Sequence, residues 1–226
     1  MKVLGLSAFH RNAAAALVVD GVVVAAIEEE RFTRKLGESR FPIRAAQFCL
    51  AEAGISAVEL DEVVFYQKPL RRFERTLASL IGSFPSSARC FSKQMFAWLG
   101  ERLWIKGRIS GELGVDPNRV RFCAHHHAHA AAAFLPSGFD DAAVLVVDGV
   151  GEWATTSLWR GRDGELEPLG EQLFPDSLGL FQSALTQYLG FEPEKDEYKL
   201  EALAAYGTPR FADRLLEVVR LEPHGV

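Results

Sequence analysis

Hydrophobic positions near the start of the chain come in short runs separated by turn residues. Three runs have the length of strands: Val3–Phe9, Ala13–Val19 and Val22–Glu29. Asp20-Gly21 before the third run is typical of a hairpin turn. Helical spacing then begins near Pro42 and ends around Gly54, and Leu60–Tyr66 returns to the pattern of a buried strand. Three antiparallel strands, a helix and a further strand predict the opening of an α/β ribonuclease-H-like fold.

The same pattern returns in the second half of the sequence. Strands are predicted at Ala143–Asp148, Ala154–Trp159 and Glu165–Leu169, with an Asp163-Gly164 turn before the third. This duplication is the layout of the actin-like ATPase superfamily. We expect the first half at residues 1–140, with a helical insertion at about 70–115, and the start of a second half at 141–226. Helices are predicted near Leu178–Leu189, Glu197–Ala205 and Pro209–Leu221. The remaining elements of a full second half are missing, so we expect a truncated second half or one that a partner chain completes.

The predicted insertion is rich in basic and aromatic residues. Between Lys68 and Arg108 the only acidic residues are Glu74 and Glu101, and apolar side chains recur at roughly helical spacing. This pattern predicts amphipathic helices. A solvated basic face over a packed aromatic stripe is the simpler interpretation, and contact with phosphate or an acidic partner domain is the alternative.

Four histidines fall within residues 125–129, on a segment that runs through alanines to Leu135 and stops at Pro136. Alanine favours helix, and on a helix His125 and His129 share one face, one turn apart. His126 and His127 point elsewhere on that helix. Asp148 ends the apolar run 144–147, and two imidazoles with one carboxylate could form an open metal site for iron, zinc or manganese alike. Ordinary polar histidines are the alternative.

Ligands of a duplicated fold bind where the hairpins of the two halves meet. His10 lies between the first two predicted strands of the first half. Asp148 begins the equivalent connection between the first two strands of the second half. There the backbone N–H groups of Gly149 and Gly151, beside Glu152, could approach an anion, although a plain tight turn is the alternative. The sequence contains neither a Walker-type phosphate loop nor a Rossmann fingerprint.

Composition narrows the class of protein further. The 226 residues carry a net charge of -5, which gives no general attraction to nucleic acid. Three cysteines without a CxxC pair indicate reduced thiols and a cytoplasmic protein. Because no stretch approaches about 18 apolar residues and the N-terminus lacks a signal-peptide layout, we expect a soluble protein without a membrane partner.

Several motifs, in order along nearly the whole chain, carry a resemblance to a known family. They are Leu4–His10, Glu28–Lys35, Phe41-Pro42, His125–Ala130, Asp148–Glu152, Ser177–Phe181 and Asp196–Lys199. With these motifs the chain resembles the N-terminal part of the NodU- and CmcH-type carbamoyltransferases, which include nodulation and antibiotic-tailoring enzymes. These enzymes are related to the tRNA threonylcarbamoyl transferases.

The resemblance implies a reaction and a division of labour. A C-terminal domain, or a partner chain, converts carbamoyl phosphate and ATP to carbamoyl adenylate. The part of the enzyme that this chain resembles binds a divalent metal, iron, and passes the carbamoyl group to a hydroxyl or amine of a small-molecule acceptor.

The resemblance also implies roles for individual residues. His125, His129 and Asp148 would be metal ligands, together with another Asp from beyond residue 226. His10 would lie where the acceptor is activated, and Lys35 would face the carbamoyl donor. The glycine turn with Glu152 would meet the nucleotide of the carbamoyl adenylate.

The sequence departs from the family pattern after His10. Arg11-Asn12-Ala13 stands where the family usually has an Asp and a Ser, and Glu201 is in an unexpected place. Two alternatives to the enzyme stay open, and this departure favours the first of them. One is a non-catalytic fragment or interaction module of this fold, and the other is a tRNA threonylcarbamoyl-type transferase, against which the acidic balance counts.

Overall fold

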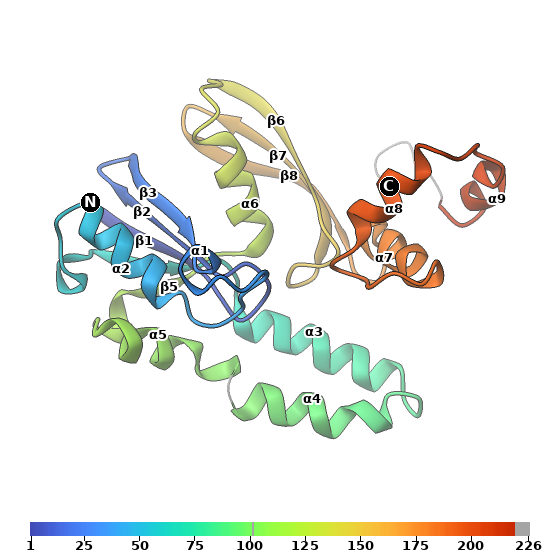
Figure 1. The fold of residues 1–226 in the computed structure, drawn as a ribbon, viewed down its shortest axis with the longest axis horizontal. Coiled ribbons are helices and arrows are strands. Elements are labelled where there is room, and N and C mark those ends of the chain that lie inside the picture. The colour runs from blue at the N-terminus through green and yellow to red at the C-terminus, as the bar shows by residue number, and fades with distance from the viewer. Residues whose placement is uncertain (101, 220–226) are drawn as a thin grey trace. The chain divides into compact units, whose positions relative to one another are not determined.

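The computed structural model describes residues 1–100 and 102–219. The chain divides into two compact units, Met1–Ala128 and the part from His129 onward. Each unit is an α/β structure with its own sheet (Figure 1). No helix among the described residues is both long enough and apolar enough to cross a bilayer.

The first unit contains a five-stranded mixed sheet with the strand order β3-β2-β1-β4-β5. The strands are β1 (Lys2–Ser7), β2 (Ala14–Val19), β3 (Val22–Glu28), β4 (Glu62–Phe65) and β5 (Val120–Phe122). β1 pairs antiparallel with β2, and β2 with β3, while β4 and β5 run parallel to β1. Asp20 and Gly21 both have positive φ, as a type I′ hairpin requires. The strand order and directions are those of the ribonuclease-H-like fold that the hydrophobic pattern predicted.

Five α-helices and three short 3-10 turns complete the described part of this unit. They are α1 (Glu30–Thr33), α2 (Ile43–Glu52), η1 (Ala57–Glu59), α3 (Pro69–Gly82), α4 (Ala88–Gly100), η2 (Arg102–Trp104), α5 (Ile105–Leu113) and η3 (Pro117–Arg119). The buried face of α2, with Ala45, Ala46 and Cys49, packs on β2 and β3. Leu4, Leu17 and Phe65 of the strands fill the same core.

The range of the predicted helical insertion, about 70–115, contains α3, α4, η2 and α5, and α3 and α4 are neighbours (Figure 1). The rings of Phe73 and Trp98 meet between them with centroids 5.6 Å apart. The aromatic stripe is therefore packed only in part, because Phe96 and Phe84 remain largely exposed.

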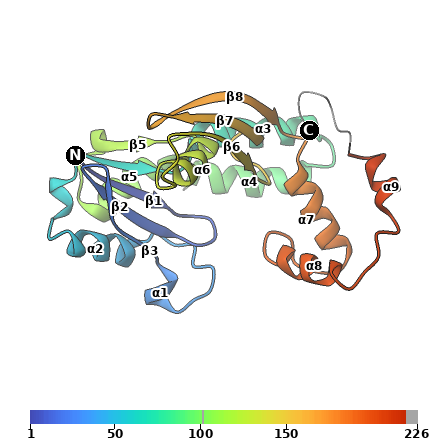
Figure 2. The ribbon, with the colours of Figure 1, turned by 90° about the horizontal axis from the view of Figure 1, so that it is seen from above.

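The second unit contains a three-stranded antiparallel sheet: β6 (Asp141–Val147), β7 (Ala154–Arg162) and β8 (Glu165–Leu173). Its described helices are α6 (His125–Phe134), α7 (Leu178–Tyr188), α8 (Glu197–Ala204) and α9 (Ala212–Leu216). Figure 2 shows α6 lying along one face of this sheet. Ala130 and Phe134 of the helix pack there against Val144 and Val146. Gly161 makes room for Phe134, because a Cβ at this glycine would lie 2.5 Å from the ring.

Two boundaries differ from those predicted. The division between the units falls inside α6, between Ala128 and His129, and not at 140/141, because the C-terminal part of this helix packs on the second sheet. The helix predicted at Pro209–Leu221 is shorter, since α9 covers only Ala212–Leu216. Positions 220 and 221 of that prediction lie outside the described residues.

Candidate metal centre

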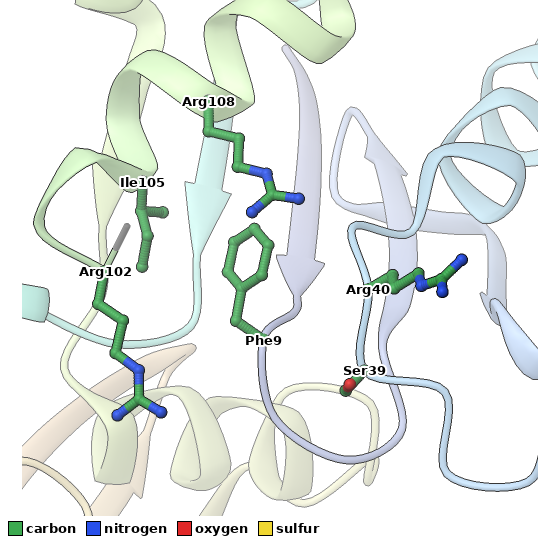
Figure 3. Close-up of a pocket in the computed structure, with 6 residues that line it drawn as sticks. All are labelled: Phe9, Ser39, Arg40, Arg102, Ile105 and Arg108. Atoms are coloured by element: carbon green, nitrogen blue, oxygen red, sulfur yellow. The ribbon is translucent and has the colours of Figure 1, made fainter. Parts of the chain in front are cut away.

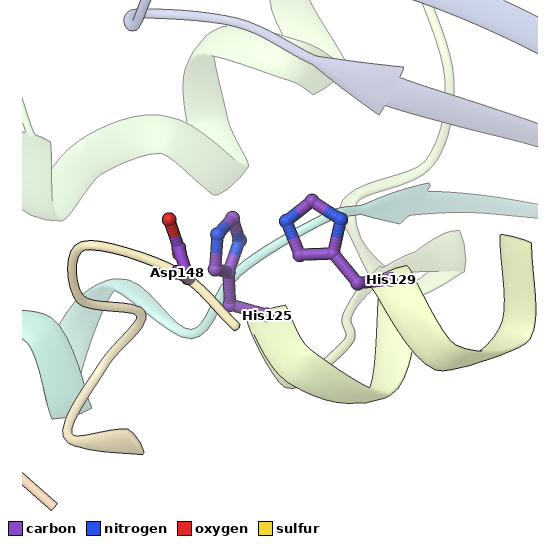
Figure 4. A group of neighbouring side chains, drawn as sticks. All are labelled: His125, His129 and Asp148. Atoms are coloured by element: carbon purple, nitrogen blue, oxygen red, sulfur yellow. The ribbon is translucent and has the colours of Figure 1, made fainter. Parts of the chain in front are cut away.

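Three side chains that the sequence singled out lie together. His125 and His129 project from successive turns of α6, and Asp148 follows the last residue of β6 (Figure 4). One possible ligand atom from each of the three lies within 4.8 Å of the other two. No further group of three or more potential ligands occurs in the residues that the structure describes.

Helix α6 sets the spacing of the two imidazoles. Its continuous run of alanines after His129 favours helix and lets the helix lie close to the sheet. His125 is half-buried, and its ring lies 5.3 Å from the ring of Tyr66, in an edge-on arrangement. His129 is exposed. His126 is buried and His127 is exposed, and neither belongs to the group, as the helical geometry predicted.

The backbone at Asp148 is fixed by the first turn of α7. The Ser177 hydroxyl donates to the carbonyl oxygen of Gly149 at 2.6 Å and accepts from the N–H of Leu180 at 3.0 Å. Gly179 allows this approach, because a Cβ there would lie 2.6 Å from the Asp148 carbonyl oxygen and 2.7 Å from the Gly149 nitrogen. The motif at 177–181 therefore has a structural role: it holds the residue that carries the carboxylate.

The Asp148 carboxylate is oriented by its own turn. Its Oδ1 accepts from the N–H of Gly149 at 2.7 Å, and the Asp148 N–H donates to the carbonyl oxygen of Thr155 at 2.9 Å. The first bond restricts the rotation of the carboxylate, and the second ties the backbone of Asp148 to β7.

The donor set fits a divalent transition metal. Two imidazoles and one carboxylate form the set typical of open non-haem iron sites, and zinc accepts the same donors. Ligands of one such ion lie at most about 4.2 Å apart, twice the usual bond length. Separations of up to 4.8 Å therefore require the three side chains to close by less than an ångström. The assignment of these residues as ligands remains a prediction.

The glycine turn that was predicted to meet a nucleotide uses its amides internally. The N–H of Gly149 donates to Asp148 Oδ1, and the N–H of Gly151 donates to the carbonyl oxygen of Ala154 at 2.9 Å. Gly151 is buried and Glu152 half-buried. These bonds give the turn a structural function, and the role of Gly149, Gly151 and Glu152 toward a nucleotide stays a prediction.

His10 and Lys35 lie in the first unit, on two segments that are joined by backbone hydrogen bonds. The N–H of Phe9 donates to the carbonyl oxygen of Ser39 at 2.8 Å, and the N–H of Ala13 to that of Glu38 at 2.7 Å. Both His10 and Lys35 are exposed. The structure thus joins the two loops that carry the candidate catalytic residues, and the catalytic roles themselves remain predictions.

Two acidic residues of the Glu28–Lys35 motif have structural roles that the sequence reasoning missed. Glu29 is only 3% exposed, and its carboxylate accepts from the N–H groups of Ala45 at 2.8 Å and Arg44 at 3.4 Å, at the start of α2. Glu30 accepts from the N–H of Gly37 at 2.9 Å. The sequence did contain a sign of the role of Glu29. Helix α2 begins after Pro42, whose side chain cannot cap it, so the first N–H groups of the helix need another acceptor.

The connection between β1 and β2 is strained. Phe9 has φ 64° and Asn12 has φ 59°. Asn adopts this left-handed region readily, whereas for a bulky Phe it is an outlier that costs about 1–3 kcal/mol. The Phe9 ring packs against those of Phe41 and Phe65, with centroids 6.4 and 6.3 Å away, and this packing helps to hold the conformation. Such strain collects at functional sites.

Comparison with known proteins identifies the family. Residues 2–221 match the model of the family described as "Carbamoyltransferase N-terminus", and the chain belongs to this family. An uncharacterized protein of Synechocystis is 50% identical over 222 residues, which are 95% of this chain and 36% of the relative. The nodulation protein NolNO of Sinorhizobium fredii is 36% identical over 91% of this chain and 31% of its own length. The chain therefore spans about a third of the length of these relatives, and the resemblance inferred from the motifs is confirmed.

Among solved structures, YeaZ from Pseudomonas aeruginosa aligns with a TM-score of 0.42 and 16% identity, over 77% of this chain and 69% of that one. Both values are too low to bear on function. The fold assignment rests instead on the strand order and directions described above.

Proposed function

We propose that this chain is the carbamoyl-transferring part of its enzyme. The carbamoyl group comes from carbamoyl adenylate, which a further domain or a partner chain makes from carbamoyl phosphate and ATP. It goes to a hydroxyl or amine of a small-molecule acceptor. The observation that carries the proposal is the grouping of His125, His129 and Asp148, in a chain that belongs to the carbamoyltransferase N-terminus family.

His125, His129 and Asp148 would hold a divalent ion, which we take to be iron. When bound, such an ion supplies a Lewis acid that can polarise the carbamoyl carbonyl and orient the donor phosphate. The chain's own contribution is a carboxylate fixed by the Ser177 contacts and two imidazoles fixed by one helix. Together with the further Asp that the resemblance implies from beyond residue 226, these ligands would leave positions of a six-coordinate ion open for the donor.

The remaining groups act on protons and charge. The acceptor oxygen or nitrogen attacks the carbamoyl carbon, and the bond from that carbon to the phosphate oxygen of the adenylate breaks. AMP leaves with the electron pair of that bond, and the proton of the acceptor passes to His10, because a neutral imidazole is a suitable base near pH 7. Lys35 provides a point charge for the leaving phosphate. Gly149, Gly151 and Glu152 are assigned to the nucleotide portion of the donor.

The test is transfer of labelled carbamoyl by the whole purified protein. With labelled carbamoyl phosphate, ATP and a panel of small alcohols and amines, we expect AMP release matched by one labelled product, a carbamate from an alcohol or a urea from an amine. His10→Ala should lower the rate by about 10²–10⁴-fold, the usual contribution of a general base. His127→Ala is the matched control on α6, outside the group, and should leave the rate unchanged.

Two outcomes contradict the proposal. AMP release without any labelled carbamate or urea in the panel would indicate a non-transferring module, and label that appears in tRNA and in no small molecule would favour the threonylcarbamoyl-type alternative. A rate that His10→Ala does not change would remove the proposed base and leave the reaction class intact.

A further inference from the structure

The first unit contains an open pocket of about 310 Å³. Its described lining residues are Phe9, Ser39, Arg40, Arg102, Ile105 and Arg108 (Figure 3). This volume is at the lower end of the range of small-molecule sites, about 300–1,000 Å³.

Phe9 and Ile105 give the pocket an apolar base. Ile105 is buried, and the Phe9 ring is anchored to the core by Phe41 and Phe65. The Arg108 guanidinium lies over the Phe9 ring, with its central carbon 4.6 Å from the ring centroid, as Figure 3 shows. Because the ring supports it, this guanidinium loses less conformational freedom on binding a ligand than a solvated arginine would.

An aromatic ring also lies beside the Arg102 guanidinium, and hydrogen bonds hold the backbone at Arg40. The Arg102 guanidinium lies 5.3 Å from the ring of Trp98. The backbone N–H groups of Ser39 and Arg40 both donate to Glu38 Oε1, at 3.0 and 3.1 Å. The Glu38 carboxylate is thus engaged by the backbone that carries Arg40.

The positive charge of the lining residues indicates which ligands the pocket can bind. Three lining residues are arginines, and the described lining includes no carboxylate, although the protein as a whole has a net charge of -5. Guanidinium groups stay charged at all working pH values, and their forked donors match the oxygens of phosphate or carboxylate.

We propose that this pocket binds the oxyanion of a small molecule, with the body of that molecule against Phe9. Phe9 is the neighbour of His10 in the strained connection between β1 and β2. The anion is therefore carried by a participant in the transfer, either the acceptor or the donor. Only the identification of the ligand as acceptor or donor rests on the proposed function. The anion site itself is inferred from the residues that line the pocket.

Titration of the whole purified protein with inorganic phosphate, at constant ionic strength, tests the site. Beside any site in the part that makes carbamoyl adenylate, calorimetry should show a saturable site that Arg108→Ala and Arg40→Ala each weaken about tenfold, since each removes a charged hydrogen-bond donor. Arg71→Ala is the matched control, an exposed arginine of α3 outside the pocket, and should change nothing. The proposal is overturned if phosphate binding does not saturate, or if Arg108→Ala and Arg40→Ala bind phosphate as tightly as the Arg71→Ala control does.

Two further titrations identify the source of the anion. A hexose 6-phosphate that binds more tightly than phosphate indicates an acceptor that carries the anion. AMP, the leaving group of carbamoyl adenylate, indicates the donor if it binds more tightly than phosphate. In either case Arg108→Ala must weaken the binding. Both results support the site. His129→Ala should retain phosphate binding, so a failure of the metal proposal is distinguishable from a failure of this one.

Discussion

The two sheets begin with the same antiparallel arrangement of three strands, but the connection after the first strand is fixed in different ways. After β1, residues 8–13 are held by hydrogen bonds to the distant segment 38–39, and two of them adopt positive φ. After β6, the turn that begins with Asp148 has none of these strained residues, and the first turn of α7 packs directly on it.

This difference separates two ways of presenting a reactive group. The first connection exposes His10 on a strained loop whose position depends on another loop. The second fixes the Asp148 carboxylate through close backbone packing, which leaves no room for a side chain at Gly179. An exposed base and a carboxylate fixed by close packing are consistent with the division of roles that we propose. Substitutions in the two regions should therefore have different consequences.

The largest effect is expected at the fixed carboxylate. Asp148→Asn removes the only negative charge of the group and should lower the affinity for ferrous iron by about a hundredfold or more. An anaerobic iron titration of the whole protein measures it, with His127→Ala as the control. Equal iron affinity in Asp148→Asn and the parent protein would refute the ligand set.

Gly179→Ala tests the packing that holds this carboxylate. The added Cβ would meet backbone atoms at 2.6 Å, and we expect a loss of stability of about 1–3 kcal/mol together with weaker iron binding. Thermal unfolding and the same titration measure the two effects. Gly170→Ala, with nothing within 4 Å of its Cβ, is the control and should be nearly neutral. A stable Gly179→Ala protein would show that α7 does not fix the turn.

Asn12 tests the strain in the first connection. Because Asn12 has φ 59°, Asn12→Ala should destabilise the protein by about 1 kcal/mol, whereas Asn12→Gly should cost little. Urea unfolding compares the two variants. If alanine and glycine behave alike, the left-handed conformation does not limit this loop.

The smallest effect concerns Glu38 and pH. Its pKa is lowered from the ordinary value of 4.5, chiefly by the backbone N–H of Arg40 and also by that of Ser39. A carboxylate with a lowered pKa contributes stability that is fully present above the unfolded value and is lost as the pH falls through the folded value. Glu38→Gln should therefore reduce stability at pH 7, and the difference from the parent protein should shrink below pH 4.5. A difference that is constant with pH would exclude this contribution.

Much of this arrangement could be predicted from the sequence, because it depends on local periodicity. Alternating and helical patterns located the strands of both sheets and the helix α2, and the spacing of His125 and His129 placed them on one face of α6. The roles of Glu29 and Gly179 could not be predicted in this way. Each depends on a contact with a segment remote in sequence, the start of α2 or the turn after β6. The boundary inside α6 was missed for the same reason, since it reflects packing on the second sheet.

The central claim is that His125, His129 and Asp148 share one metal ion. Diffraction from crystals of the whole protein grown with ferrous iron, measured on both sides of the iron absorption edge, tests it directly. The account predicts one anomalous peak in bonding contact with all three side chains. A peak elsewhere, or an iron-loaded protein in which any of the three points away from the ion, would contradict it.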